Sequence, residues 1–179
     1  MKRFFHLKKY LYFLGPVCAL ATSSALWASA TDLQATLLPA KGSHAAGHLT
    51  FSQQSDGSIR IQGQISGLTP GKHGFHVHMV GDCSDPDAGF QKAQGHFNPE
   101  GTHHGALHDG HAGDLGNIAA DAKGNAVINV TTKKFTLVRG KRSIVGRAIM
   151  VHHGMDDEKT DPAGNSGARE LCGVVGRSS

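Results

Sequence analysis

Hydrophobic and polar residues alternate over short stretches through most of the chain, and turn-forming residues separate these stretches. Alternation with a period of two is typical of β-strands that bury one face. The segments 55–57 (Ser-Asp-Gly) and 121–125 (Asp-Ala-Lys-Gly-Asn) each join two such stretches and predict β-hairpins. The predicted strands are residues 33–38, 48–53, 59–66, 74–78, 114–120, 126–130, 135–138, 143–151 and 173–175. Many short strands with glycine-rich turns predict an all-β fold, an antiparallel sandwich or barrel.

Two long segments, 79–112 and 152–172, do not follow this pattern. Both are rich in Gly, His, Asp and Pro. Long loops without regular structure are uncommon in a compact domain, and those that occur usually carry function. We therefore expect the chemistry of the protein in these two loops.

The first thirty residues differ from the rest of the chain. Residues 1–9 are basic, residues 10–26 are mostly apolar, and Ala28-Ser29-Ala30 supplies small residues that suit signal peptidase. This order predicts a secretory signal peptide over residues 1–30 and a single domain over residues 31–179. A membrane anchor is the alternative, but glycine and proline interrupt the apolar run, and spanning a bilayer takes roughly 20 apolar residues. Lipid attachment at Cys18 is a second alternative.

Removal of the signal peptide changes the charge and the cysteine count. Of the 18 basic residues, four lie in residues 1–30, so residues 31–179 carry 14 basic and 14 acidic residues and are neutral. A neutral domain gives no indication of nucleic acid or an anionic membrane as a partner. Cys83 and Cys172 remain, and an even pair in an exported protein predicts a disulfide rather than two free thiols.

Histidine is concentrated in the middle of the chain: eight of the 12 histidines after residue 30 lie between His73 and His111. His76 and His78 alternate in Gly-Phe-His-Val-His, so in a strand both imidazoles point to one face. Phe75 and Val77 then point to the other face, toward the core. This pattern is a weak indication of metal binding when it stands alone.

A second cluster makes metal binding the better interpretation. His96, His104, His111 and Asp114 lie within nineteen residues, and zinc commonly takes four such nitrogen and oxygen ligands. A solvated polar loop is the alternative interpretation of the same residues. His152 ends an apolar stretch, where a strand would hold its side chain rigidly.

Five ordered motifs resemble those of copper/zinc superoxide dismutases. They are Gly-Phe-His-Val-His, Gly-His-Phe-Asn-Pro, His-Ala-Gly-Asp-Leu-Gly-Asn, Gly-Arg-Ala-Ile-Met-Val-His and Gly-Asn-Ser-Gly-Ala-Arg followed by Cys-Gly-Val-Val-Gly. The resemblance implies a Greek-key β-barrel with two functional loops and one copper and one zinc per subunit. The implied copper ligands are His76, His78, His96 and His152, and the implied zinc ligands are His96, His104, His111 and Asp114.

The resemblance also implies an activity, the disproportionation of superoxide to dioxygen and hydrogen peroxide. His96 would bridge the two metals and, with Arg169, take part in catalysis, and Asp156 would hydrogen-bond one ligand of each metal. Cys83 and Cys172 match the family disulfide. Imidazoles suit both oxidation states of copper, and zinc has no redox chemistry, so the residue types agree with these roles.

Two loop lengths depart from the eukaryotic form of the family. The segment from Cys83 to His96 is longer and the segment from Asp156 to Arg169 is shorter, and Ala163 replaces a threonine that often lines the channel. These departures and the signal peptide resemble the bacterial periplasmic branch, so we expect the periplasm, with secretion outside the cell as the alternative. A monomer and a homodimer both remain open. Candidates for steering superoxide are Lys92 and Lys159.

A metal carrier and a zinc hydrolase are the alternative functions for a domain with these residues. A metal carrier built on the same barrel would typically lack a copper ligand or the channel arginine, and here the set is complete. A zinc hydrolase needs an open coordination position, whereas the zinc set already has four ligands. The remaining histidines are interpreted as structural (His73), structural or solvated (His153) and solvated (His44, His48, His103, His108).

Overall fold

The computed structural model describes Met1 and residues 33–177. The strands are β1 (Leu33–Pro39), β2 (Ala46–Gln53), β3 (Ile59–Ser66), β4 (Gly71–Val77), β5 (Asp114–Ala120), β6 (Ala126–Thr132), β7 (Ala148–His152) and β8 (Arg169–Val174). Two short 3-10 helices, η1 (Pro86–Ala88) and η2 (Gln91–Ala93), lie between β4 and β5. Residues 33–177 contain no α-helix, so the all-β prediction is confirmed.

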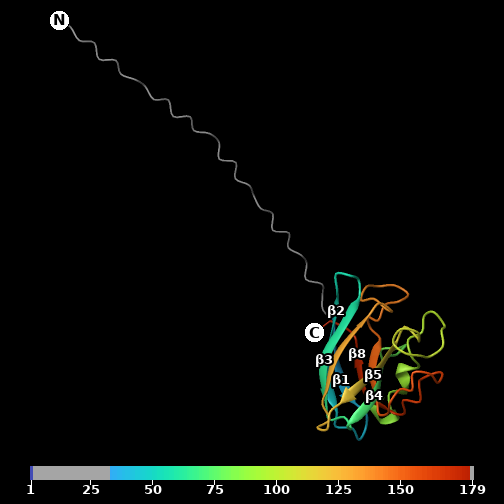
Figure 1. Ribbon diagram of the computed structural model, residues 1–179. Helices are drawn as coiled ribbons and strands as arrows, with labels where there is room; N and C mark the ends of the chain where they lie inside the picture. Colours follow the sequence, from blue (N-terminus) through green and yellow to red (C-terminus); the bar gives the residue numbers. More distant parts are fainter. Residues whose placement is uncertain (2–32, 178–179) are drawn as a thin grey trace.

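The eight strands form one antiparallel sheet that curls into a nearly closed barrel (Figure 1). The strand order is β5-β4-β7-β8-β1-β2-β3-β6. β5 and β6 form the two edges of the sheet; the turn 121–125 joins them, and they pack against each other. The chain crosses the barrel between β3 and β4 and again between β6 and β7, which is a Greek-key connection.

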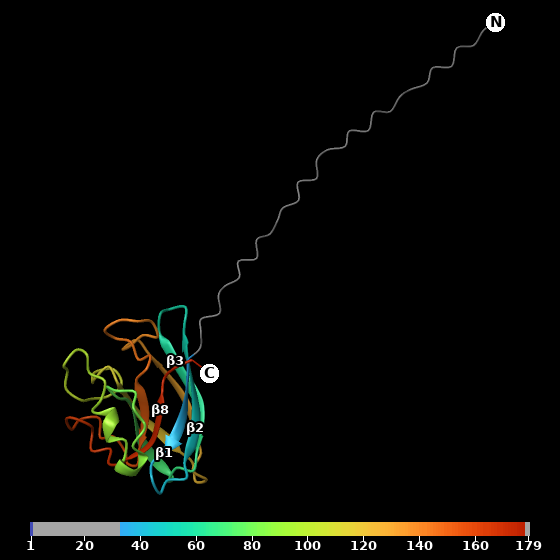
Figure 2. The same cartoon turned by 180° about the vertical axis from the view of Figure 1, so that it is seen from behind.

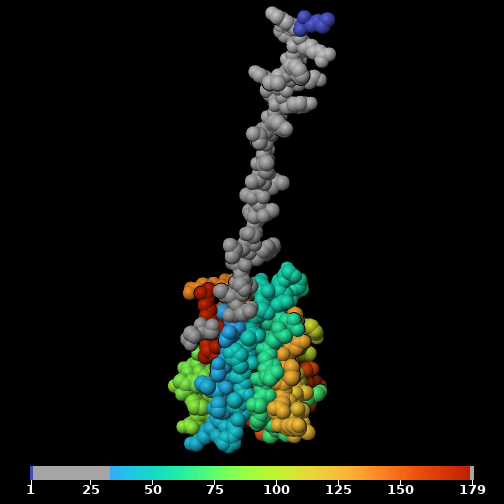
Figure 3. Space-filling view, turned by 90° about the vertical axis from the view of Figure 1, so that its left-hand side faces the viewer, coloured from blue at the N-terminus to red at the C-terminus, as the bar shows by residue number. Residues whose placement is uncertain are grey.

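The core fills the barrel because alternate side chains of each strand point inward. In β1, Leu33, Ala35 and Leu37 are buried, and the residues between them are more exposed. Figure 3 shows the outer surface of β1, β2, β3 and β6, which lie side by side on the face opposite the long loops. The barrel therefore has one sheet face that is largely open to solvent and one that is covered.

The two long loops lie together on one side of the barrel (Figures 1 and 2). Beneath the first loop is a small second core, separate from the interior of the barrel. Its buried members are Phe90, Ala93, Ala148, Met150 and Cys172. The disulfide Cys83–Cys172, with Cα atoms 5.8 Å apart, joins this loop to β8, as the sequence predicted.

Among the predicted strands that differ from the observed elements, two lie in or beside the crossing between β6 and β7. Residues 135–138 are not a strand; they belong to the crossing between β6 and β7, where Thr136 forms an isolated bridge with Ser143. β7 begins at Ala148 rather than at residue 143 because residues 144–147 form a turn, closed by the hydrogen bond from Arg147 N–H to Ile144 O. Phe135 and Ile144 are nevertheless fully buried. Their apolar character reflects packing against the barrel and not strand pairing.

The predicted signal peptide over residues 1–30 lies outside the described residues, apart from Met1. Among the described residues, no helix has the length and hydrophobicity needed to cross a bilayer.

Candidate metal centre

Two irregular strands deliver three of the predicted ligands. The pairing of β4 with β5 shifts register between Gly74 and His76, and the pairing of β7 with β8 shifts between Val151 and His152. Such bulges turn individual side chains out of the regular alternation and often lie beside active sites. His76 and His78 project under the loops, whereas Phe75 and Val77 lie in the core, as predicted.

A closed set of backbone hydrogen bonds joins the three segments that carry the ligands. Val77 N–H donates to Gly113 O (2.9 Å), Gly113 N–H donates to Phe97 O (2.8 Å), and Phe97 N–H donates to Val77 O (2.8 Å). We call this set the backbone triangle. A Cβ at position 113 would collide with the carbonyl oxygen of Val77, so the triangle requires glycine there. It places His78, His96 and Asp114 next to one another.

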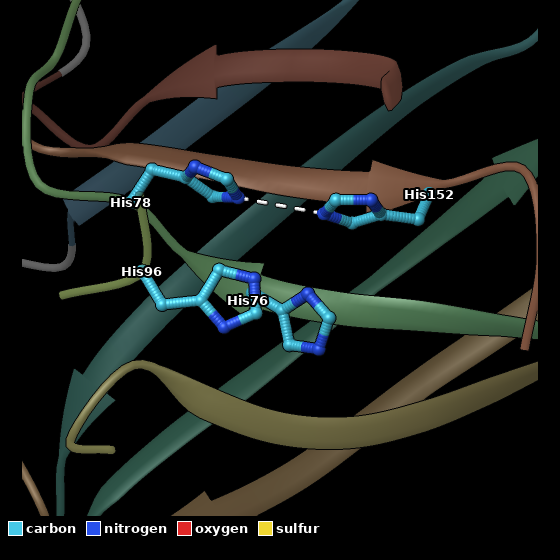
Figure 4. A group of neighbouring side chains, drawn as sticks. All are labelled: His76, His78, His96 and His152. Carbon is cyan, nitrogen blue, oxygen red and sulfur yellow. Dashed lines mark hydrogen bonds between the residues drawn. The ribbon is translucent and has the colours of Figure 1, made fainter. Parts of the chain in front are cut away.

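The four predicted copper ligands form one buried group. One side-chain nitrogen from each of His76, His78, His96 and His152 lies within 4.8 Å of the others. The Nε2 atoms of His78 and His152 are 3.4 Å apart, and Figure 4 shows these two rings facing each other above those of His76 and His96. His78 Nδ1 donates to Gln94 O (2.8 Å) and His152 Nδ1 to Gly167 O (3.2 Å). Each of these rings therefore keeps its Nε2 for the centre of the group.

The four predicted zinc ligands form a second buried group around a carboxylate. Asp114 Oδ1 lies 2.8 Å from His96 Nδ1 and 3.2 Å from His111 Nδ1, and Asp114 Oδ2 lies 3.1 Å from His104 Nδ1. The backbone N–H groups of His111 and Gly105 donate to Asp114 Oδ2 at 2.8 and 3.2 Å. Backbone hydrogen bonds from the loop thus hold the Asp114 carboxylate in place without a contribution from a metal ion.

His96 belongs to both groups, and its two nitrogens point to different ones. Nδ1 faces Asp114 in the second group. Nε2 is buried and has no hydrogen-bonding partner among the described residues. Buried imidazole nitrogens without partners are costly, and His76 Nδ1, His104 Nδ1 and His111 Nδ1 share this condition. All four nitrogens belong to the two groups, so the donor sets fit metal ions.

Asp156 connects the two groups from outside. Its Oδ2 accepts from His76 Nε2 (2.6 Å) and its Oδ1 from His104 Nε2 (2.8 Å), so it fixes one ring of each group. The side chain of Asn117 holds the backbone of Asp156 through a reciprocal pair of hydrogen bonds of 2.8 and 2.9 Å. Asn117 ends the motif His-Ala-Gly-Asp-Leu-Gly-Asn, and the sequence analysis assigned it no role.

Burial keeps the imidazoles of His76, His78 and His152 neutral. It lowers the pKa of His76 and His78 well below the usual value, and it lowers the pKa of His152 to about 4. Burial alone would raise the pKa of Asp114, but the hydrogen bond from His96 and the nearby imidazoles outweigh it, so the pKa falls. Neutral imidazoles and an ionised carboxylate are the forms that bind metals.

A cavity of about 300 Å³ opens onto the first group. Its lining includes His78, His96, His152 and Arg169. The guanidinium of Arg169 donates to the carbonyl oxygens of Phe90 and Gln94 in the first long loop. These hydrogen bonds fix a positive charge at the wall of the cavity, beside the histidines.

Several other predictions can be compared with the structure. Ala163 lines the cavity, as predicted. Lys92 and Lys159 do not line it, and their role in steering superoxide stays a prediction. Gln91 also lines it, and the sequence offered no signal for that role. His73 is structural, as predicted: its two ring nitrogens lie 2.8 Å from the carbonyl oxygens of His152 and Thr69. The exposed histidines are His44, His48, His103, His108 and His153.

Comparison with known proteins decides the family. Residues 45–175 match the family described as copper/zinc superoxide dismutase (SODC). The chain belongs to this family. It is 44% identical over 138 residues to "Superoxide dismutase [Cu-Zn] 2" of Mesembryanthemum crystallinum, which covers 73% of this chain and 86% of that protein. A crystal structure of the clock protein EA4 is similar at a TM-score of 0.74 and 37% identity, covering 84% of this chain and 96% of that one.

Because it belongs to this family, the protein is an enzyme, a superoxide dismutase of the copper/zinc type, with copper and zinc as cofactors. The fold agrees with this, since an eight-stranded Greek-key barrel carries both histidine groups. The curated relative is a plant protein, so membership does not extend to the bacterial branch expected from the loop lengths.

Proposed function

We propose that copper binds the first group (His76, His78, His96, His152), that zinc binds the second (His96, His104, His111, Asp114), and that His96 bridges them. The observation that carries this proposal is the position of the His96 ring. Its Nδ1 lies 2.8 Å from Asp114 Oδ1, and its buried Nε2 has no partner among the residues described. One ring thus offers a nitrogen to each group.

The reaction converts two superoxide ions and two protons into one dioxygen and one hydrogen peroxide. Copper, when bound, supplies the one-electron exchange, and zinc supplies a fixed positive charge. His96 Nε2 would carry one of the two protons to the peroxide whenever it is not bound to copper, and the second proton would come from solvent. Because Nδ1 is held beside Asp114, the ring keeps its position while Nε2 gains and loses that proton.

Arg169 binds the incoming anion in this proposal. A guanidinium stays charged at any working pH, and here it lines the cavity beside His152. Its hydrogen bonds to the carbonyl oxygens of Phe90 and Gln94 hold it in place without neutralising it. Asp156 orients His76 and His104, and partners of this kind typically affect metal affinity or activity by about 10–100-fold.

We also propose export to the periplasm, as in the bacterial branch of the family. Support comes from the pattern of residues 1–30 and from the Cys83–Cys172 disulfide, which is typical of oxidising compartments. N-terminal sequencing of the exported protein is expected to begin near Thr31. Protein that retains residues 1–30 would refute export by this route. Light scattering on the same preparation distinguishes a monomer from a homodimer.

Metal analysis combined with a superoxide assay tests the proposed site. The wild-type protein should bind one copper and one zinc and disproportionate superoxide. His152→Ala should lose copper and activity but keep zinc, because His152 belongs only to the first group. Arg169→Gln should keep both metals, lose activity and bind azide more weakly. Full activity of Arg169→Gln at full metal occupancy would refute the role of Arg169, and wild-type protein with both metals and no activity would refute the mechanism.

A further inference from the structure

Asp161 connects the second long loop to the predicted zinc ligand His104. Its Oδ1 accepts a hydrogen bond from the backbone N–H of His104 at 2.6 Å. Its Oδ2 lies 2.6 Å from Nδ1 of the neighbouring His103. Asp161 lies 57 positions after His104 and 58 after His103, and the two loops that carry these residues lie together on one side of the barrel (Figure 1).

Asp161 and Asp156 hold His104 at two different points. Asp156 holds the far end of the ring, at Nε2 (2.8 Å), and Asp161 holds the backbone nitrogen (2.6 Å). A side chain fixed at its backbone and at its outer end has little rotational freedom left. The remaining ring nitrogen, Nδ1, is buried without a hydrogen-bonding partner in the described chain and lies 3.1 Å from Asp114 Oδ2 in the second group.

The segment between these two carboxylates has its own internal support. Asp157 accepts hydrogen bonds from the backbone N–H (2.8 Å) and hydroxyl (2.6 Å) of Thr160 and from the side chain of Asn165 (2.9 Å). Gly164 N–H donates to Thr160 O at 2.7 Å. Asp161 lies inside this network, directly after Thr160, so its carboxylate is placed by the loop rather than by contact with His104 alone.

Gly164 shows how closely this loop approaches the ligand. A Cβ at position 164 would collide with the carboxylate of Asp156 and with the His104 ring, and the backbone there has a φ of +61°. The loop therefore covers the outer side of His104 without space for a side chain. The contacts of Asp161 and the packing at Gly164 are independent observations of the same close approach.

We propose that Asp161 is a positioning residue for His104 and that it slows the release of zinc from the second group. This inference rests on the zinc assignment above. The exposed pair with His103, whose side chain is 95% exposed, contributes little, because exposed ion pairs are weak. The hydrogen bond from the backbone of His104 to a charged acceptor is the main contribution.

Zinc release from the copper- and zinc-loaded enzyme tests the inference, with a chromogenic zinc chelator as the probe. Asp161→Ala should release zinc about tenfold faster, the lower end of the range for residues that orient metal ligands. Asp161→Asn keeps an oxygen that can accept from His104 N–H and should restore most of the slow release. His103→Ala should change release less than twofold. Asp87→Ala is the matched control, since Asp87 is an exposed carboxylate of the first long loop and pairs with Lys41.

Cobalt(II) in the zinc position provides a second measurement that does not depend on activity. Asp161→Ala should shift the visible absorption bands of bound cobalt, because the His104 ring changes orientation, while the metal-free variant unfolds at the wild-type urea concentration. Release at the wild-type rate with unchanged cobalt bands would overturn the inference. Equal behaviour of the Asn and Ala variants would overturn the backbone hydrogen bond as its cause. Wild-type protein that binds no zinc would refute the proposed function instead.

Discussion

Phe90 is the residue through which the first long loop should contribute most to stability. It is fully buried in the small second core, together with Ala148, Met150 and Cys172. Its φ of 57° lies in the left-handed region, where a side chain other than glycine is uncommon. Its carbonyl oxygen accepts a hydrogen bond from Arg169. Replacement of Phe90 should therefore affect both the stability of the protein and the position of Arg169.

Phe90→Ala should lower the free energy of unfolding by about 3–4 kcal/mol. A buried Phe→Ala substitution costs about 3–5 kcal/mol through lost burial and the cavity left behind. The backbone strain does not change this difference, because alanine is also unfavourable at positive φ. The disulfide does not offset the loss either, since it constrains the unfolded chain of both proteins equally. Phe90→Leu keeps most of the volume and should cost less than about 1.5 kcal/mol.

Urea unfolding of the metal-free, disulfide-bonded protein measures this difference. The superoxide assay on the metal-loaded variants measures the second effect. Phe90→Ala should retain both metals but lose up to about tenfold in kcat/KM, because a small displacement of Arg169 weakens its contact with the anion. A loss below 1 kcal/mol in Phe90→Ala would show that the second core does not hold the loop, and the link between Phe90 and Arg169 would fail with it.

Three further predictions concern the rest of the scaffold. Gly113→Ala should cost about 2–3 kcal/mol in urea unfolding, because a Cβ there collides with the backbone triangle, whereas Gly176→Ala, with open space around it, should stay within about 0.5 kcal/mol. Metal-free protein should lose stability as the pH falls from about 6.5 to about 4. Over that range the imidazole of His152 takes up a proton in the unfolded chain but not in the folded protein, where its pKa is about 4, so acid favours unfolding. A urea midpoint that stays constant over that range would contradict this. Replacing Cys83 and Cys172 with serine should cost about 4–5 kcal/mol for a separation of 89 residues, and a loss under 1 kcal/mol would contradict the entropic estimate.

Much of the barrel could be predicted from local pattern. Alternation located β1, β2, β3 and β6 to within a few residues, because each of these strands has one buried and one more exposed face. β5 is buried along most of its length, and the predicted hairpin turn after it marked its end. The pattern failed at residues 135–138, where Phe135 is buried by packing in a crossing loop. It also placed the start of the last strand at residue 173, whereas β8 begins at Arg169. β8 opens with two polar residues, Arg169, which lines the cavity at the metal centre, and Glu170, which accepts a hydrogen bond from Ser43, so hydrophobicity does not mark them.

The two metal groups could be predicted because their residue types are chemically restricted. The spacing of His76 and His78 and the cluster from His96 to Asp114 carried that information. The contacts of Asp161 could not be predicted, because aspartate is common in turns and its partner lies 57 residues away. The carbonyl partners of Arg169 could not be predicted either, since any residue type at positions 90 and 94 would supply the same backbone oxygens.

The backbone triangle separates the parts of the chain that tolerate changes in length from those that do not. Its three hydrogen bonds use only main-chain atoms of Val77, Phe97 and Gly113, so they constrain position at all three residues and residue identity only at Gly113. The connecting segments 79–95 and 98–112 begin and end at these points. An insertion in the exposed part of segment 79–95 leaves His78, His96 and Asp114 anchored by the triangle. An insertion in segment 98–112 would displace His104 or His111, the predicted zinc ligands that lie within it. Diversification of this domain is therefore expected through loop length and not through displacement of the three anchor points.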